Sequence, residues 1–202
     1  IGTVNSFFIG FTSTFIATTL GTMAALGLSR PHMPYKGLIM AILISPMIVP
    51  LIITAAGMFF FYARVNLVYT FTGVILAHVA LATPFVVITV TATLVGFDMN
   101  MVKASQSLGA RPVRTSFKVI MPLILPGVIS GALFAFITSF DEVVIVMFMA
   151  SLDQLTIPKQ MWAGIRQEIS PVILCMATCL VVLSIFLLTT VELLRRRSEK
   201  LR

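Results

Sequence analysis

Two adjacent carboxylates, Asp141 and Glu142, stand within an apolar stretch that covers residues 123–150. A charged side chain is costly to place among apolar ones, so such residues are candidates for function. A carboxylate attracts cations, and the aromatic rings of Phe140 and Tyr62 could add cation–π surface. We therefore predict a pathway for a cationic solute that at least one of the two carboxylates lines. The alternative is that the pair lies near the outer membrane interface or pairs with a basic residue of a partner subunit.

A basic loop at residues 96–122 is the second segment whose residue types suggest a function. Ser105 and Leu108 lie on one face of a predicted helix. Gly109 is suited to end that helix in the left-handed conformation, and Pro112 is suited to the first turn of a second helix. The pattern therefore predicts a helix, a glycine turn and a second short helix.

This loop presents a knob of small and apolar side chains that is ringed by basic charge. The knob consists of Ala104, Ser105, Leu108, Gly109 and Ala110, and the basic residues are Lys103, Arg111, Arg114 and Lys118. One interpretation is an amphipathic segment that lies on anionic lipid headgroups. The helix break and the small knob favour docking into a groove of another protein.

The motifs of common enzyme classes are absent from the sequence. It contains no G-x-x-x-x-G-K-[ST] phosphate-binding loop, no H-E-x-x-H and no G-x-S-x-G. Its two histidines, His32 and His78, lie in separate segments, and no His, Asp or Glu is near the two cysteines in sequence. We therefore predict no catalytic residue, no metal site and no cofactor, and a membrane enzyme is the weaker hypothesis.

The segments that must position these residues are mostly long apolar stretches. The chain of 202 residues is 58% hydrophobic and 10% charged, with a mean hydropathy of +1.06, whereas soluble domains are roughly 45–50% apolar and about 25% charged. A membrane-spanning helix needs about 20 mostly apolar residues. Five stretches qualify, at residues 4–28, 37–62, 68–95, 123–150 and 172–194. We predict an all-α polytopic membrane protein that forms one domain over residues 1–202, with Pro46 and Pro50 disturbing the second span.

The distribution of basic residues predicts the orientation of these spans. If loop 96–122 is inside, eleven of the fourteen lysines and arginines are inside, including those of a basic tail at residues 195–202. The three outside are Arg64, Lys159 and Arg166. This asymmetry follows the positive-inside rule, so the net charge of +7 does not indicate a nucleic-acid partner. Because successive loops alternate between the two sides of the membrane, Ile1 is predicted to lie outside. We expect one further helix upstream of it.

The loop resembles the EAA loop of the membrane subunits of ABC importers with the type I fold. The pattern of that family is E-A-A-x-x-x-G, about nine residues, and then I-x-L-P. Here Lys103, Ala104 and Ser105 stand at the first three positions, Gly109 at the glycine, and Pro122 closes the segment after Ile120 and Met121. Lys thus replaces Glu and Ser replaces the second Ala, while the glycine turn and the small knob are kept. The apolar spans around the loop also resemble the core helices of these permeases, so the resemblance extends over essentially the whole chain.

The resemblance implies a transport mechanism and a set of partners. The chain would pair with a second permease subunit, identical or different, in a bacterial inner membrane. Residues Lys103, Ala104, Ser105, Leu108, Gly109, Ala110 and Pro122 would belong to the loop that docks on one of two cytoplasmic ATPase subunits. A periplasmic binding protein would deliver the substrate. The stretch "SFDEVVI" is most similar to permeases of spermidine and putrescine importers, which implies a polyamine substrate.

Two other functions stay open on the residues alone. The chain could be an ABC importer permease for another small organic solute, because relatives with other substrates look similar. It could also be a secondary transporter or channel driven by an ion gradient, which would function without an ATPase.

Overall fold

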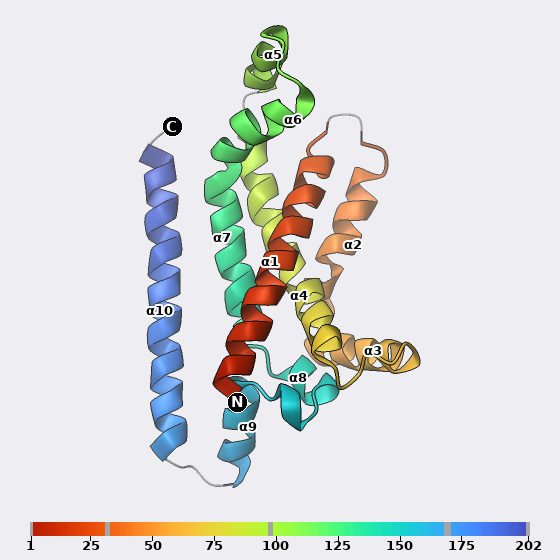
Figure 1. Ribbon diagram of the computed structural model, residues 1–202, viewed down its shortest axis with the longest axis vertical. Helices are drawn as coiled ribbons and strands as arrows, with labels where there is room; N and C mark the ends of the chain where they lie inside the picture. Colours follow the sequence, from red (N-terminus) through yellow and green to blue (C-terminus); the bar gives the residue numbers. More distant parts are fainter. Residues whose placement is uncertain (1, 31–32, 97–98, 168–170, 201–202) are drawn as a thin grey trace.

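Three helices that pack against one another form the centre of the molecule. The computed structural model describes residues 2–30, 33–96, 99–167 and 171–200, and these residues form helices and connecting turns with no strands. The central helices are α1 (Gly2–Leu28), α4 (Phe71–Val95) and α7 (Met121–Phe140) (Figure 1). The predicted all-α class is therefore confirmed.

Glycines allow these three helices to approach closely. A Cβ atom added to Gly21 of α1 would lie 2.7 Å from the Cβ of Val86 in α4. One added to Gly131 of α7 would lie 3.0 Å from the Cα of the same valine. Small residues at helix contacts are typical of membrane proteins, where association depends on tight packing rather than on the exclusion of water.

The second apolar stretch is bent rather than straight, as its two prolines predict. It forms α2 (Lys36–Ile48) and α3 (Leu51–Arg64), which meet at 106° across a break of two residues. Pro50 lies in this break and has no backbone N–H for a helix hydrogen bond. In Figure 1, α3 turns away from the bundle, whereas α2 runs along it and contacts α4.

The fourth apolar stretch differs from its prediction, because it is not one helix through residue 150. α7 ends at Phe140, and a separate helix of six residues, α8 (Val144–Met149), follows it. The break falls on Asp141 and Glu142, so the two carboxylates lie between helices and not within one. A short 3-10 helix, η2 (Leu152–Gln154), then leads to α9 (Ile157–Gln167).

The last helix, α10 (Pro171–Lys200), runs along the outside of α7 (Figure 1). By length and composition, α1, α4 and the helical run Pro112–Phe140 are long enough to cross a membrane, and the bent pair could form a fourth span. The described apolar part of α10, Leu174–Thr190, is shorter. The count of five spans therefore stays a prediction. The side chains of the predicted basic tail, 195–202, lie outside the part that the structure describes.

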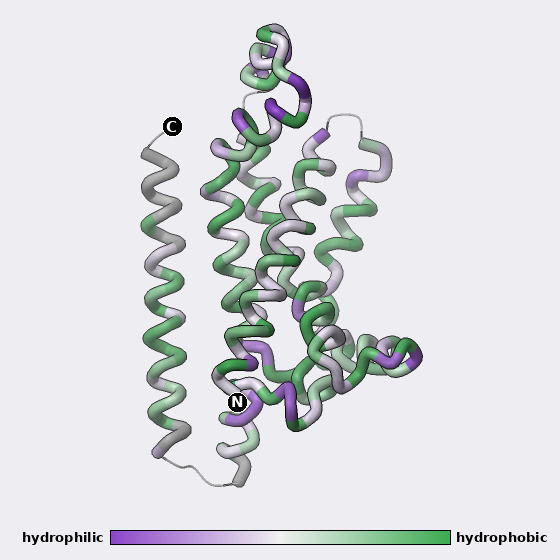
Figure 2. Tube along the Cα trace, in the orientation of Figure 1, coloured by the Kyte–Doolittle hydropathy of each residue, from purple (hydrophilic) through white to green (hydrophobic). Residues whose placement is uncertain are grey.

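The helix surfaces are suited to lipid or to partner subunits. Figure 2 shows hydrophobic residues over most of the length of the long helices, with hydrophilic ones concentrated towards the ends of the molecule. Phe15 and Ile48 are each 75% exposed, and Phe60 is 68% exposed. Large apolar side chains exposed in this number are typical of surfaces that face a membrane or another protein.

Candidate functional site

The basic loop forms the helix–turn–helix that its sequence predicts. α5 (Met99–Ser107) ends in a Schellman motif, in which Gly109 N–H donates to the Gln106 carbonyl at 2.9 Å and Ala110 N–H to the Ser105 carbonyl at 3.1 Å. Gly109 has φ = +80°, a left-handed conformation that favours glycine. The short helix α6 (Pro112–Thr115) then begins with Pro112 in its first turn. Residues 97 and 98 of the predicted loop lie outside the described part.

The predicted knob is the tip of a projection beyond the helical bundle. In Figure 1, α5 and α6 stand past the end of α1 and α4. The side chain of Leu108 is 88% exposed at the turn. Lys103, Ala104 and Gly109 are exposed as well, whereas Ser105 and Ala110 are half-buried. Pro122 is not part of this tip, because it lies in the first turn of α7.

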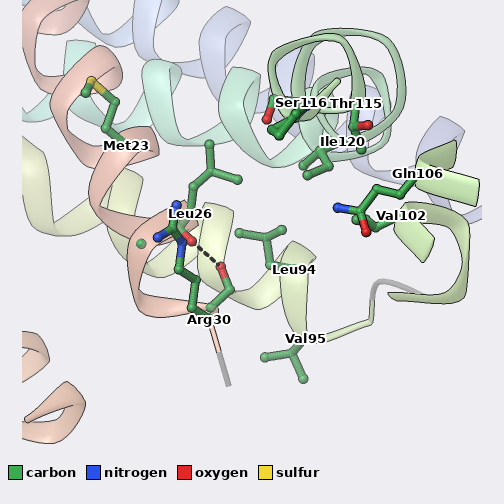
Figure 3. Close-up of a pocket in the computed structure, with 13 residues that line it drawn as sticks. Met23, Leu26, Arg30, Leu94, Val95, Val102, Gln106, Thr115, Ser116 and Ile120 are labelled. Carbon is green, nitrogen blue, oxygen red and sulfur yellow. Dashed lines mark hydrogen bonds between the residues drawn. The ribbon is translucent and has the colours of Figure 1, made fainter. Parts of the chain in front are cut away.

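A cavity of about 620 Å³ separates the loop from the ends of α1 and α4 (Figure 3). Its walls are mostly apolar, with polar side chains contributed by the loop and by the end of α1. The lining residues used below are Leu26, Leu94, Val102, Gln106, Thr115 and Ser116. No sequence pattern indicated this cavity, because it forms where the end of α1 lies opposite the end of α4 and the loop, which are distant from α1 in sequence.

The two adjacent carboxylates have different surroundings. Asp141 is exposed and lines a cavity of about 250 Å³ between α7 and α10, together with Phe136, Phe140 and Ser184. Glu142 is only 7% exposed, and its Oε1 accepts a hydrogen bond of 2.7 Å from Ile145 N–H in the first turn of α8. Asp141 is thus a carboxylate that faces a cavity, whereas Glu142 is a buried carboxylate that caps a helix. That at least one of them lines the pathway stays a prediction.

Lys159 holds the other end of the short helix α8. Its Nζ donates to the carbonyl oxygens of Val146 at 3.2 Å and Ala150 at 3.3 Å. Burial lowers the pKa of this ammonium group from its ordinary value, because removal from water disfavours the charged form. Glu142 and Lys159 thus provide polar partners at both ends of α8.

The two aromatic residues proposed for cation–π contact lie in different clusters. Phe140 is buried, and its ring centroid lies 5.2 Å from that of Phe136 and 5.1 Å from that of Phe7. Tyr62 of α3 is half-buried and packs against the larger apolar cluster, to which α1, α3, α4, α7 and α8 contribute. The structure therefore brings Phe140 together with Asp141, but it does not place Tyr62 in that cavity. No group of three or more His, Cys, Asp or Glu that could hold a metal ion occurs among the described residues.

Comparisons with known proteins agree on one kind of molecule. The family model described as "Binding-protein-dependent transport system inner membrane component" matches residues 17–200. The chain is 31% identical over 196 residues to the spermidine/putrescine transport system permease protein PotC of Haemophilus influenzae, which covers 97% of this chain and 76% of that protein. The chain is 30% identical over 190 residues to PotC of Escherichia coli K12, and this match covers 94% of this chain and 72% of that protein.

A third relative and two solved structures extend the picture. The putrescine transport system permease protein PotI of Escherichia coli K12 is 34% identical over 103 residues, covering 51% of this chain and 37% of that protein. An inward-facing structure of the MetNI methionine ABC transporter superposes with a TM-score of 0.76 at 19% identity, covering 98% of this chain and 94% of the other. An amino acid ABC transporter superposes with a TM-score of 0.68 at 19% identity, covering 97% of this chain and 92% of the other. These two structural similarities show that the fold is shared.

Proposed function

The chain belongs to the family of binding-protein-dependent transport system inner membrane components, and we propose that its substrates are polyamines such as spermidine and putrescine. It is a membrane-spanning permease subunit of an ABC importer. It is not an enzyme, because a separate ATPase subunit hydrolyses the ATP. Membership also implies a partner permease and a substrate-binding protein.

The observation that carries the polyamine assignment is the similarity over nearly the whole chain to two proteins named as spermidine/putrescine permeases. The cavity between α7 and α10 supports it, because the Asp141 carboxylate and the rings of Phe136 and Phe140 line the same space. A polyamine carries several ammonium groups. A carboxylate attracts them more strongly in a partly dehydrated passage than in water, and aromatic faces add cation–π attraction.

The basic loop is proposed to connect this subunit to the ATPase. Leu108 is almost fully exposed on a tight turn with small residues beside it, which suits insertion into a groove of another protein. The surrounding lysines and arginines would be attracted to acidic residues at the rim of such a groove. ATP-driven movement of the ATPase would then reach the membrane helices through this loop.

The assembly that we propose contains two permease subunits, identical or different, and two cytoplasmic ATPase subunits. It lies in a bacterial inner membrane with the basic loop in the cytoplasm. A periplasmic binding protein delivers the polyamine to the opposite face, where α8 and α9 lie. The positive-inside distribution of lysine and arginine supports this orientation.

Uptake of labelled spermidine into vesicles that contain the assembled transporter tests the substrate. Asp141→Asn should lower uptake, while ATPase stimulation by the loaded binding protein persists. Asp153→Asn is the matched control, because it removes an exposed carboxylate from the same end of the molecule without touching the cavity. Polyamine transport that is unchanged in Asp141→Asn would remove this residue from the pathway. Transport of an anionic or neutral solute in place of polyamines would refute the substrate class.

Copurification of the ATPase subunit tests the docking loop. Leu108→Asp places a charge in the proposed apolar contact and should release the ATPase. Leu152→Asp is the control, since Leu152 is 81% exposed at the other end of the molecule. If Leu108→Asp retains the ATPase as well as the control does, the loop is not the docking element.

A further inference from the structure

A chain of hydroxyl groups joins the two helices of the basic loop. Ser105 of α5 donates from its Oγ to the Val102 carbonyl at 2.8 Å. The same Oγ lies 3.0 Å from Oγ1 of Thr115 in α6. Because a carbonyl only accepts and serine has one hydroxyl proton, Thr115 is the donor in the second bond. Thr115 is 2% exposed, although its neighbours Arg114 and Ser116 are exposed.

This contact matters because α5 packs against the segments that lead into α7. The described backbone connection from α5 to α6 is the turn at Gly109. On its other side, α5 faces the cavity, so Val102 and Gln106 look across open space towards Leu26 and Leu94 (Figure 3). α5 contacts α6 and η1 (Ser116–Ile120), the segments that lead into α7, so a movement of α5 can reach α7 through these contacts.

α6 continues directly into a central helix. Thr115 is followed by a π-helical segment, η1 (Ser116–Ile120), and then by α7, so that Pro112–Phe140 is one helical run. π-helical turns inside longer helices occur frequently at functional sites. The run ends at Phe140, next to Asp141 and the proposed substrate cavity. Thr115 thus lies at the point where the loop joins the helix that leads to the other side of the membrane.

We propose that Ser105 and Thr115 form a latch that holds α5 against α6, so that movement of the docked ATPase is passed to α7. This inference rests on the proposed docking role of the loop and adds the positioning residues that transmit the movement. It also explains a departure from the family pattern, since Ser105 replaces an alanine and supplies the hydroxyl that accepts from Thr115. The latch acts within the loop, and its Thr115 side is buried.

The test removes each hydroxyl in the assembled transporter and measures substrate molecules imported per ATP hydrolysed. Ser105→Ala and Thr115→Val should each lower this ratio roughly fivefold, the size expected from one lost hydrogen bond. The double variant should be no worse than the more impaired single variant, because both residues act through one bond. Ser105→Thr and Thr115→Ser keep a hydroxyl at each position and should retain most of the wild-type ratio.

Three further measurements separate a latch from a general structural role. ATPase copurification and the KM for ATP should stay unchanged in Thr115→Val, because Thr115 is buried and lies outside the knob that is proposed to dock. Spin labels at the exposed positions Ser107 and Val113 should give one narrow distance in the wild type and a broadened one in the double variant. A wild-type ratio in the double variant, or losses that add, would overturn the latch. Loss of the ATPase from Leu108→Asp together with wild-type coupling in the latch variants would refute the latch while sparing the docking loop.

Discussion

Gly109 offers a test in which the cost of a substitution is purely conformational. A Cβ atom at this position would meet no atom within 4 Å, so a larger side chain fits without a clash. The backbone, however, has φ = +80°, and a left-handed conformation costs residues other than glycine about 1–2 kcal/mol. Gly109→Val should therefore open the Schellman turn and lower the population of the docking-competent loop about 5- to 30-fold.

The assay is the affinity of the assembled permeases for the ATPase subunit, measured by dilution of the complex. Gly109→Val should weaken it by the same factor. Gly109→Asn should weaken it less, because asparagine tolerates the left-handed region better than branched residues do. Gly37→Val is the matched control, since the space around Gly37 is equally open but its φ is not positive. Equal affinity in Gly109→Val and Gly37→Val would show that the turn is not needed for docking and would refute the reasoning.

Three other predictions test separate parts of the structure. Glu142→Ala leaves the buried N–H group of α8 without its acceptor and should lower the free energy of unfolding by about 1–3 kcal/mol. Glu142→Gln keeps an acceptor oxygen and should preserve both stability and polyamine uptake. Thermal unfolding in detergent measures the stability, and transport of labelled polyamine measures the uptake. In a chain without its native cysteines, Leu152→Cys should react with an impermeant thiol reagent added from outside and Ser116→Cys should not; the reverse pattern would overturn the orientation. Gly131→Leu should lower the melting temperature because its Cβ would lie 2.5–3.0 Å from atoms of α4, and an unchanged melting temperature would contradict the close packing.

Local signals explain what the sequence could predict. The bend at Pro50 follows from a missing N–H and a fixed φ, which do not depend on the rest of the fold. The loop turn is similar, because Gly109 and Pro112 determine where one helix stops and the next begins. The all-α class follows from the length and apolar character of the stretches, since backbone groups in lipid must be satisfied within the helix.

Contacts between distant segments explain what the sequence could not predict. Hydropathy is high on both sides of Phe140, so nothing in the composition showed that α7 ends there and that α8 is separate. The Ser105–Thr115 bond joins residues ten positions apart across a turn whose geometry sequence patterns do not specify. The cavity beside it depends on how the ends of α1 and α4 are placed relative to the loop, which is a property of the packed bundle.

The different surroundings of Asp141 and Glu142 follow from the break between α7 and α8. A new helix start leaves backbone N–H groups without intrahelical partners, and these groups are costly when they are buried in apolar surroundings. Glu142 supplies an acceptor to one of them at 2.7 Å, and Lys159 supplies donors to carbonyls at the far end of α8. The charged groups of Glu142 and Lys159 thus both serve as hydrogen-bond partners for the backbone of α8. A carboxylate engaged in this way cannot move with a passing cation without uncapping α8. Asp141 faces a cavity whose lining includes Phe136 and Phe140. We therefore propose Asp141, rather than Glu142, as the carboxylate that binds and releases a polyamine.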